Sequence, residues 1–196
     1  MATRLDYRNK LKDKLLGIED EGYGDFEYTD PELNTYLELA VARLYPAVYK
    51  RIAQAGLALT SYGTVRAGSL AATSPERVFL VEDDTEREAV YGWKIRPTSI
   101  VGINRDDFLT TSTFTVYYHD AHTLPADDTT DAGIPAIYTP LVVLGALVEA
   151  LESRHDTGVR PDPTAGHGET QLVDRLTSRY ERLKDELAMS LPVITV

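Results

Sequence analysis

The stretch that decides the fold is residues 30–56, which read DPELNTYLELAVARLYPAVYKRIAQAG. Its apolar residues recur at steps of three and four, which is the spacing of one face of an α-helix. Asp30 can cap the first turn, and Pro31 suits the first helical position, where an N–H would have no partner. We therefore expect one long amphipathic helix over residues 30–55.

Two residues shape the C-terminal half of this expected helix. Pro46 removes one backbone hydrogen bond and predicts a kink near Leu44 and Tyr45. Gly56 is a favourable stop, because glycine readily adopts the left-handed conformation that ends many helices. The first helical part is therefore expected to occupy residues 1–56.

The N-terminal stretch is first basic and then acidic. Four leucines predict a short amphipathic helix that breaks at Gly17: Leu5, Leu11, Leu15 and Leu16. Residues 19–29 are expected to form a loop that orders only on contact. Three explanations of this uneven charge are open. The basic and acidic stretches form solvated faces, or they form complementary surfaces between neighbouring copies, or the acidic residues line a channel past which DNA can slide. The basic residues are Arg4, Arg8, Lys10, Lys12 and Lys14; the acidic ones are Glu19, Asp20, Glu21, Asp25, Glu27, Asp30 and Glu32.

Beyond Gly56 the pattern changes to alternation and to β-branched and aromatic residues, which predicts strands. The charged residues 82–86 are expected to form the turn of a hairpin. The expected strands are residues 57–62, 77–81, 89–95, 99–103 and 113–118.

Two more helices are expected after these strands. Residues 139–154 are apolar nearly all round, which is typical of a helix that is central in the core or sandwiched between partners. Residues 169–189 carry one apolar stripe, and the Gly- and Pro-rich residues 155–167 are expected to link the two helices. The stripe comprises Leu172, Leu176, Tyr180, Leu183 and Leu187.

The predicted fold class is α+β: a helical bundle core with a small, mainly antiparallel β-sheet insert between the second and third helices. The chain is expected to form a single domain over residues 1–196. Its parts are a helical N-terminal part (1–56), a β insert (57–124), a second helical part (134–190) and an apolar tail (191–196).

Composition excludes several classes of protein. The chain has no cysteine, so disulfides and thiolate metal sites are excluded. Its net charge of −11 argues against a nucleic-acid reader, which usually carries a basic surface. The first residues contain no apolar signal segment, and the most apolar stretch, residues 134–148, is too short to span a bilayer. We expect a soluble intracellular product with no membrane partner.

No group of residues predicts a metal site or a cofactor. His119, Asp120 and His122 come closest, but these histidines are three residues apart at a strand end. Helical zinc sites place two histidines four residues apart, and no third ligand can be named here. Solvated histidines near a loop are therefore the favoured interpretation.

No catalytic residue is predicted either. Ser69 lacks the second glycine of a nucleophile elbow. The paired carboxylates lie in hydrated turns, where nothing raises a pKa for acid catalysis: Asp83 with Asp84, and Asp127 with Asp128. We therefore expect a protein that is not an enzyme.

Tyrosines favour contacts with other chains, but only mildly. The chain has twelve tyrosines and four phenylalanines, and tyrosine is common at interfaces. Core packing with the hydroxyl reaching solvent is the alternative for each one. The candidates for a subunit interface are Tyr36, Tyr45, Tyr49 and Tyr180.

Residues 191–196 are apolar and β-prone, although a solvated tail is usually polar. This tail is expected either to fold back on its own core or to dock on another subunit as a strand or hook. The docking residues would be Leu191, Pro192, Val193, Ile194 and Val196.

Seven short segments of the sequence, in their order along the chain, resemble those of a known family. They are residues 30–33 (DPEL), 40–46 (AVARLYP), 77–81 (RVFLV), 92–95 (GWKI), 115–118 (TVYY), 124–125 (LP) and 150–152 (ALE). Their order and texture, over about residues 29–189, resemble the head-to-tail adaptor (connector) proteins of long-tailed bacteriophages, in particular those that infect actinobacteria. The β insert is larger than in the small, mostly helical adaptors.

The resemblance implies a structural virion protein without catalytic residues or cofactors. Such adaptors form a ring, commonly of twelve copies, beneath the portal at the capsid vertex. The apolar tail docks on the portal protein, and the opposite face receives the next connector or tail-side protein. DNA passes through the lumen without sequence-specific binding. The location implied is the neck of the virion, the head-tail junction, after synthesis in the host cytoplasm.

Three alternatives remain open. A tail-completion or tail-terminator protein would form a ring that binds the tail tube and ignores the portal. A monomeric binding module would hold a carbohydrate or peptide with the β insert and Trp93. A metal hydrolase would use His119, Asp120 and His122.

Overall fold

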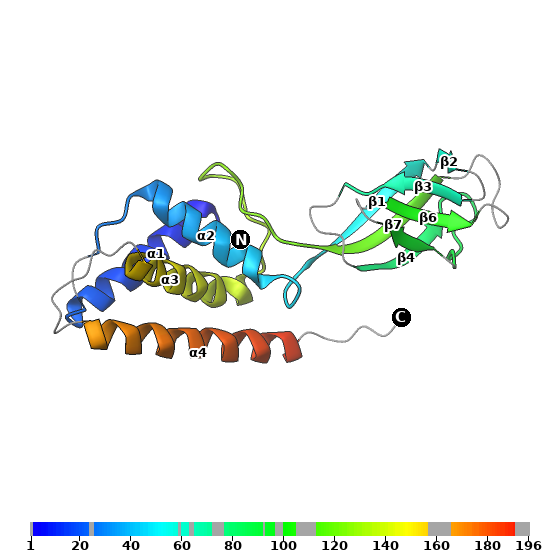
Figure 1. The fold of residues 1–196 in the computed structure, drawn as a ribbon. Coiled ribbons are helices and arrows are strands. Elements are labelled where there is room, and N and C mark those ends of the chain that lie inside the picture. Colours follow the sequence, from blue (N-terminus) through cyan, green and yellow to red (C-terminus); the bar gives the residue numbers. More distant parts are fainter. Residues whose placement is uncertain are drawn as a thin grey trace. The chain divides into compact units, whose positions relative to one another are not determined.

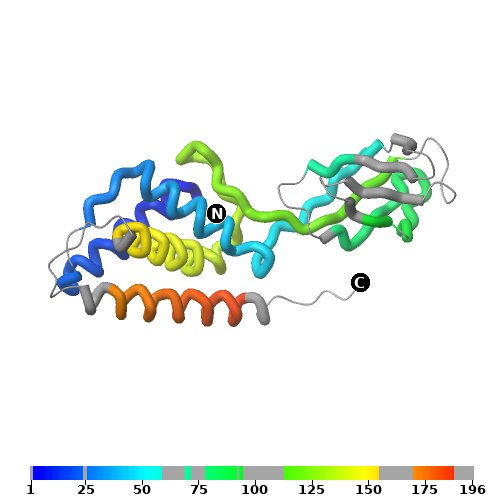
Figure 2. The backbone as a smooth tube through the Cα atoms, in the orientation of Figure 1, coloured from blue at the N-terminus to red at the C-terminus, as the bar shows by residue number. Residues whose placement is uncertain are grey.

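The structure is a computed structural model that describes residues 2–23, 26–58, 60–62, 65–71, 77–91, 93–96, 100–104, 113–156 and 166–190. It divides into two compact units (Figure 1). Met1–Val48 and His122–Val196 form the helical unit, and Tyr49–Ala121 form the β unit. Figure 2 traces the backbone of each unit. The predicted α+β class, with β structure between the second and third helices, is confirmed.

The third helix is the centre of the helical unit, because the other three helices all pack on it. This confirms the prediction made from its apolar composition. Its buried side chains point in every direction around the axis: Leu141, Val142, Val143, Ala146, Leu147, Val148, Ala150 and Leu151. The elements are α1 (Arg4–Asp20), α2 (Asp30–Leu44), the 3-10 turn η2 (Ala136–Tyr138), α3 (Thr139–Asp156) and α4 (Gly166–Ser190).

Gly145 allows two helices to approach α3 closely. A Cβ atom placed on Gly145 would lie 3.0 Å from the ring of Tyr180 on α4 and 3.2 Å from the Cβ of Ala40 on α2. These distances are shorter than ordinary carbon contacts. The absence of a side chain at Gly145 therefore sets how tightly α2 and α4 pack on α3.

The expectation that the most apolar stretch is too short to span a bilayer needs correction, because the segment Ala136–Arg154 is long and apolar enough by length and composition alone. It is the one such segment among the described residues, and 67% of its most apolar 18-residue stretch is buried inside the structure. The central helix of a bundle has the same composition, so the segment is weak evidence for a membrane span.

The β unit contains two antiparallel sheets. Its core lies against the three-stranded sheet and is formed by Leu57, Leu70, Val78, Val81, Val90, Phe114, Val116 and Tyr118. The three-stranded sheet has the order β1-β7-β4, with β1 (Lys50–Ala58), β4 (Arg77–Asp83) and β7 (Thr113–Asp120). The four-stranded sheet has the order β2-β3-β6-β5, with β2 (Thr60–Tyr62), β3 (Val65–Ser69), β5 (Lys94–Arg96) and β6 (Ile100–Asn104).

The prediction of one helix over residues 30–55 is wrong beyond Leu44. Tyr45 has extended dihedral angles, φ −74° and ψ 140°, because the ring of a following proline disfavours the helical region. β1 begins at Lys50, so the expected boundary at residue 56 lies too late. Gly56 has a positive φ of 68° and lies at a break in the β1–β7 register. It therefore belongs to a β-bulge and does not end a helix.

The predicted hairpin of residues 77–81 and 89–95 forms only in part. β4 extends to Asp83, and after the turn the N–H of Val90 donates to the Val81 carbonyl at 2.7 Å, next to an isolated bridge between Ala89 and Glu82. Lys94–Arg96 pairs instead with β6 in the other sheet. Alternation identified the strand, but it does not determine which strand is the partner.

Three smaller expectations about helix ends also need correction. α1 continues through Gly17 to Asp20. The residue that caps α2 is Thr29, whose N–H and hydroxyl both donate to Glu32 Oε2 at 2.7 Å. The expected linker of residues 155–167 is shorter, because α3 extends to Asp156 and α4 begins at Gly166.

Candidate functional site

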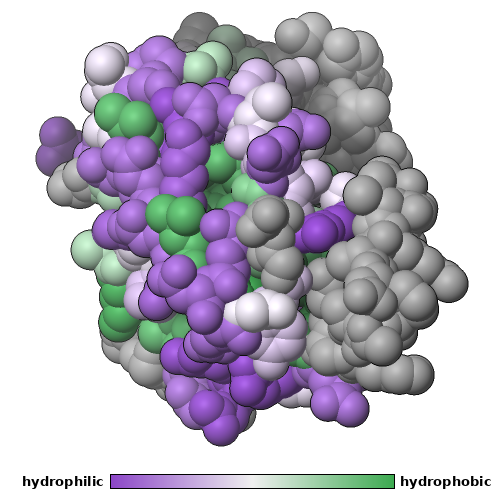
Figure 3. All heavy atoms as spheres, turned by 90° about the vertical axis from the view of Figure 1, so that its left-hand side faces the viewer, coloured by the Kyte–Doolittle hydropathy of each residue, from purple (hydrophilic) through white to green (hydrophobic). Residues whose placement is uncertain are grey.

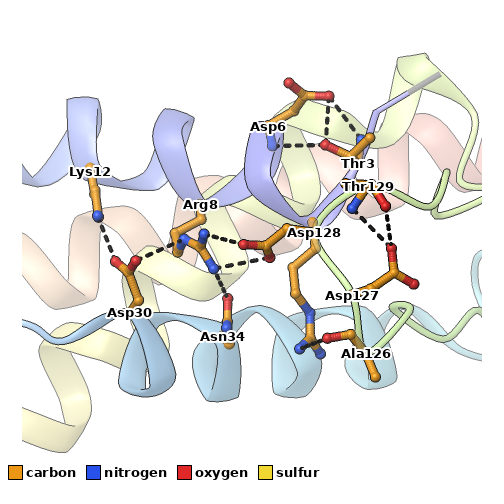
Figure 4. Close-up of polar contacts among 11 residues, drawn as sticks. Thr3, Asp6, Arg8, Lys12, Asp30, Asn34, Ala126, Asp127, Asp128 and Thr129 are labelled. Carbon is orange, nitrogen blue, oxygen red and sulfur yellow. Dashed lines mark hydrogen bonds and ion pairs between the residues drawn. The ribbon is translucent and has the colours of Figure 1, made fainter.

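Two nearly buried arginines connect α1 to the rest of the helical unit (Figure 4). Arg8 donates to both carboxylate oxygens of Asp128, at 3.1 and 2.5 Å, and to Asn34 Oδ1 at 3.1 Å. Arg4 forms an ion pair with Glu38 and donates to the carbonyl of Ala126 at 3.2 Å. Paired hydrogen bonds from one guanidinium to one carboxylate are strong and directional. They fix α1 against α2 and against the segment that leads to η2.

Lys12 adds a more exposed pair on the same side of α1. Its ammonium lies 2.6 Å from Asp30 Oδ1, and Arg8 Nε lies 3.6 Å from Asp30 Oδ2. The hydrogen bond from Lys12, assisted by the charge of Arg8, lowers the pKa of Asp30. Asp30 can make these pairs because Thr29, and not Asp30, caps α2.

Asp127 organises the turn that carries Asp128. Its Oδ1 accepts from the backbone N–H groups of Thr129 and Thr130 at 2.9 and 2.6 Å. These hydrogen bonds, first of all from Thr130, hold the pKa of Asp127 well below its usual range. The hydrogen bonds of Asp127 therefore give this carboxylate a structural role in the turn.

A groove opens on another side of the helical unit, between α1 and α4. Its volume is about 890 Å³. In Figure 3, which faces one end of this unit, green apolar side chains reach the surface between purple polar ones. The apolar floor comprises Val143, Leu144 and Leu147 on α3 with Leu172, Leu176 and Leu183 on α4.

Four cations line this groove: Lys10 and Lys14 on α1, and Arg175 and Arg179 on α4. All four are exposed, and none forms an ion pair with a carboxylate in the part of the chain that the structure describes. Among the described residues that line the groove, the acids are Asp13 and Glu21. The surroundings of the groove are therefore basic, although the whole chain has a net charge of −11.

The cations of α1 thus divide into two sets. Residues 4, 8 and 12 follow one another at four-residue steps, and each pairs with a carboxylate of the same chain. Lys10 and Lys14 lie about 200° around the helix from Arg8 and Lys12, respectively, and line the groove. The sequence offered solvated faces or pairing between copies for all five. It did not predict the pairs within the chain, which join residues as far apart as 8 and 128.

The tyrosines predicted at a subunit interface have contacts inside their own units. Tyr36 donates to Ser153 Oγ at 3.1 Å, and Tyr180 is 5% exposed and lies against Gly145. Tyr45 is half-buried, between α2 and β1. Tyr49 belongs to the β unit, where its ring stacks on His119 with centroids 3.7 Å apart. These contacts agree with core packing, although the Tyr180 hydroxyl is buried and does not reach solvent, and the interface itself remains a prediction.

The predicted docking tail, residues 191–196 with Leu191, Pro192, Val193, Ile194 and Val196, lies outside the described residues. The groove between α1 and α4 was not predicted from the sequence. Its signal is present in the sequence, as basic residues at four-residue steps on two amphipathic helices. Only the packing of α1 and α4 on α3 reveals that the basic residues of the two helices line the same apolar groove.

The interpretation of His119 and His122 as solvated histidines is wrong, because His122 is buried and His119 is half-buried. Among the described residues no three His, Cys, Asp or Glu side chains lie close enough to hold a metal ion. Asp120 is buried and pairs with Lys50 at 3.7 Å, and His119 stacks on Tyr49. Ser69 is exposed at the end of β3, and its carbonyl oxygen accepts from the side-chain amide of Gln54.

One face of the three-stranded sheet carries a row of aromatic rings. Phe79 is 40% exposed, and its ring centroid lies 4.9 Å from that of His119 and 6.2 Å from that of Tyr117. Tyr117 and the buried Tyr118 point to opposite faces of β7, as alternation predicted. Trp93, which the sequence suggested as a binding residue, is instead partly buried against the core of the β unit.

Comparison with models of known protein families found no match, and comparison with curated proteins found no similar sequence.

Proposed function

We propose that this chain is a structural virion protein, a head-to-tail connector. It forms a ring under the portal, joins the phage capsid to the tail and lets DNA pass. The proposal extends the resemblance in segment order to connectors of long-tailed bacteriophages. It also gives a role to the apolar groove of the helical unit and to the cations that line it.

The groove between α1 and α4 is the observation that carries this proposal. Its apolar floor offers hydrophobic contact, and its four unpaired cations offer complementary charges to a partner. Charge at the edge of an interface mainly sets partner choice and association rate, while the apolar centre supplies most of the affinity. Such a surface suits a protein whose role is to hold other chains together.

The test is the mass of the purified chain, alone and mixed with the portal protein of the same virus, by native mass spectrometry. A ring, or a monomer that joins the portal in a fixed high stoichiometry, is the expected result. Truncation after Ser190 is expected to abolish portal binding, since residues 191–196 would be the hook. A chain that ignores the portal but binds the tail tube would be the tail-completion or tail-terminator protein.

The aromatic row on the β unit favours a second candidate, a binding module for a carbohydrate or peptide. The exposed ring of Phe79 and the half-buried ring of Tyr117 offer stacking and apolar contact. A ligand of this face would perturb the NMR signals of Phe79 and Tyr117 in the wild-type chain and would be lost in Phe79→Ser. Binding without any change at these two residues would exclude this face.

A further inference from the structure

The groove has the dimensions of a site for one helix. Its wall on α1 runs from Lys10 to Glu21, and its wall on α4 runs from Leu172 to Leu183. At 1.5 Å per residue each wall is about 16 Å long. An amphipathic helix that lies in an apolar groove is a common mode of recognition between protein chains. A small apolar ligand would use the floor but would leave the four cations without partners.

The outer face of α2 has the complementary chemistry. Glu32, Thr35, Leu39 and Ala42 follow one another at steps of three and four, and all four are exposed. Leu39 is a large apolar side chain that is 46% exposed. From Glu32 to Ala42 this face is about 15 Å long, which matches the groove.

Acidic side chains flank Leu39 on this face. The Glu38 side chain is 54% exposed although it pairs with Arg4. Hydrogen bonds from Thr29 lower the pKa of Glu32, so Glu32 keeps its negative charge at neutral pH. An α2 face with an exposed leucine and the carboxylate of Glu32 thus complements an apolar groove lined by lysine and arginine, since Arg43 on the same face is already paired with Glu149.

We infer that the groove of one copy receives the outer face of α2 of a second copy. The groove and the outer face of α2 are different surfaces, so the contact is head-to-tail. Contacts of this kind close into rings or continue as filaments. The inference deepens the ring proposed above and rests on it.

The test uses two full-length variants, each with one surface disabled. Arg175→Glu/Arg179→Glu reverses the charge of the groove but keeps α2. Leu39→Lys places a cation on α2 but keeps the groove. All three residues are exposed, so both variants are expected to keep the wild-type circular dichroism spectrum. Arg182→Glu, also exposed on α4 but not part of the groove, is the matched control.

Sedimentation velocity of the chains, with no portal present, decides the inference. The wild type and Arg182→Glu should form large oligomers that weaken as salt rises, because salt screens exposed charges. Each disabled variant alone should stay monomeric. Their one-to-one mixture should form dimers and nothing larger, because one intact groove then meets one intact α2.

Several outcomes would overturn the inference. They are disabled variants that assemble like the wild type, a mixture that stays monomeric, or a wild type still monomeric at about 1 mM, the weak end of specific association. These results would not contradict the proposed connector function, because a ring that is held together only by the portal needs no contact between the groove and α2. Conversely, a chain that assembles head-to-tail but does not bind the portal would contradict the proposed connector function. The inferred contact between the groove and α2 would still hold.

Discussion

At the scale of single residues, Gly145 is the position where packing leaves no room for a side chain. A Cβ there would lie 3.0 Å from the Tyr180 ring and 3.2 Å from Ala40. Gly145→Val is expected to lower the free energy of unfolding by about 1–3 kcal/mol through overpacking.

Gly17 is the matched control, because a Cβ there meets nothing within 4 Å. Gly17→Ala should stabilise by about 0.5–1 kcal/mol, through lower backbone entropy in the unfolded chain. Urea denaturation of both variants checks this, and equal effects would contradict it.

Asp127 gives a prediction about pH. Its pKa is lower in the folded chain than in the unfolded one, because backbone N–H groups donate to its carboxylate. The charged carboxylate therefore stabilises the fold above about pH 4, and this stabilisation is lost as pH falls below about 4. Asp127→Asn should be less stable than the wild type at pH 7, and the difference should shrink between pH 4 and pH 2.5. A difference that stays constant over this range in urea denaturation would show that the charge is not involved.

At the scale of elements, the docking of α1 depends on a buried arginine more than on exposed pairs. Asp128→Ala leaves the 6%-exposed Arg8 without its main partner and is expected to cost about 1–3 kcal/mol. Lys12→Ala removes a pair that is about half exposed on both sides, so its cost should stay below about 1 kcal/mol. Thermal and urea denaturation measure both. A Lys12→Ala variant that is less stable than Asp128→Ala would contradict the claim that the buried arginine contributes more to the docking of α1 than the exposed pair.

The elements also show how far the sequence alone leads. The apolar composition of α3 and the stripe of α4 each have one good explanation, and both helices were predicted. Ile52 and Gln54 fit either a helix or a half-buried strand, because a short stretch satisfies both periods. Only the pairing of β1 with β7, about sixty residues later, decides between them. The Thr29–Glu32 cap could have been found from its Thr-x-x-Glu spacing, whereas the pair of Arg8 with Asp128 depends on the tertiary fold.

At the scale of the whole molecule, the β unit is one continuous insert, Tyr49–Ala121, in a helical unit made of two segments. Lys50 and Asp120 are direct partners in the β1–β7 ladder, so their Cα atoms lie about 5 Å apart. A short Gly-Ser linker in place of residues 49–121 should therefore leave a folded helical unit. Cooperative thermal melting of the helical circular dichroism signal tests this. The same linker in place of α3 should abolish folding, and loss of folding in both variants would contradict the division into units.

The pairing of Lys50 with Asp120 also determines how the chain responds to mechanical load. Tension that pulls Lys50 away from Asp120 acts on the two sides of one rung of the β1–β7 ladder. It therefore opens β1 and β7 one rung at a time, as a zipper opens, and does not shear all their hydrogen bonds at once. The β unit would yield to a weak pull of this kind, and load passing through the packed helices would bypass it.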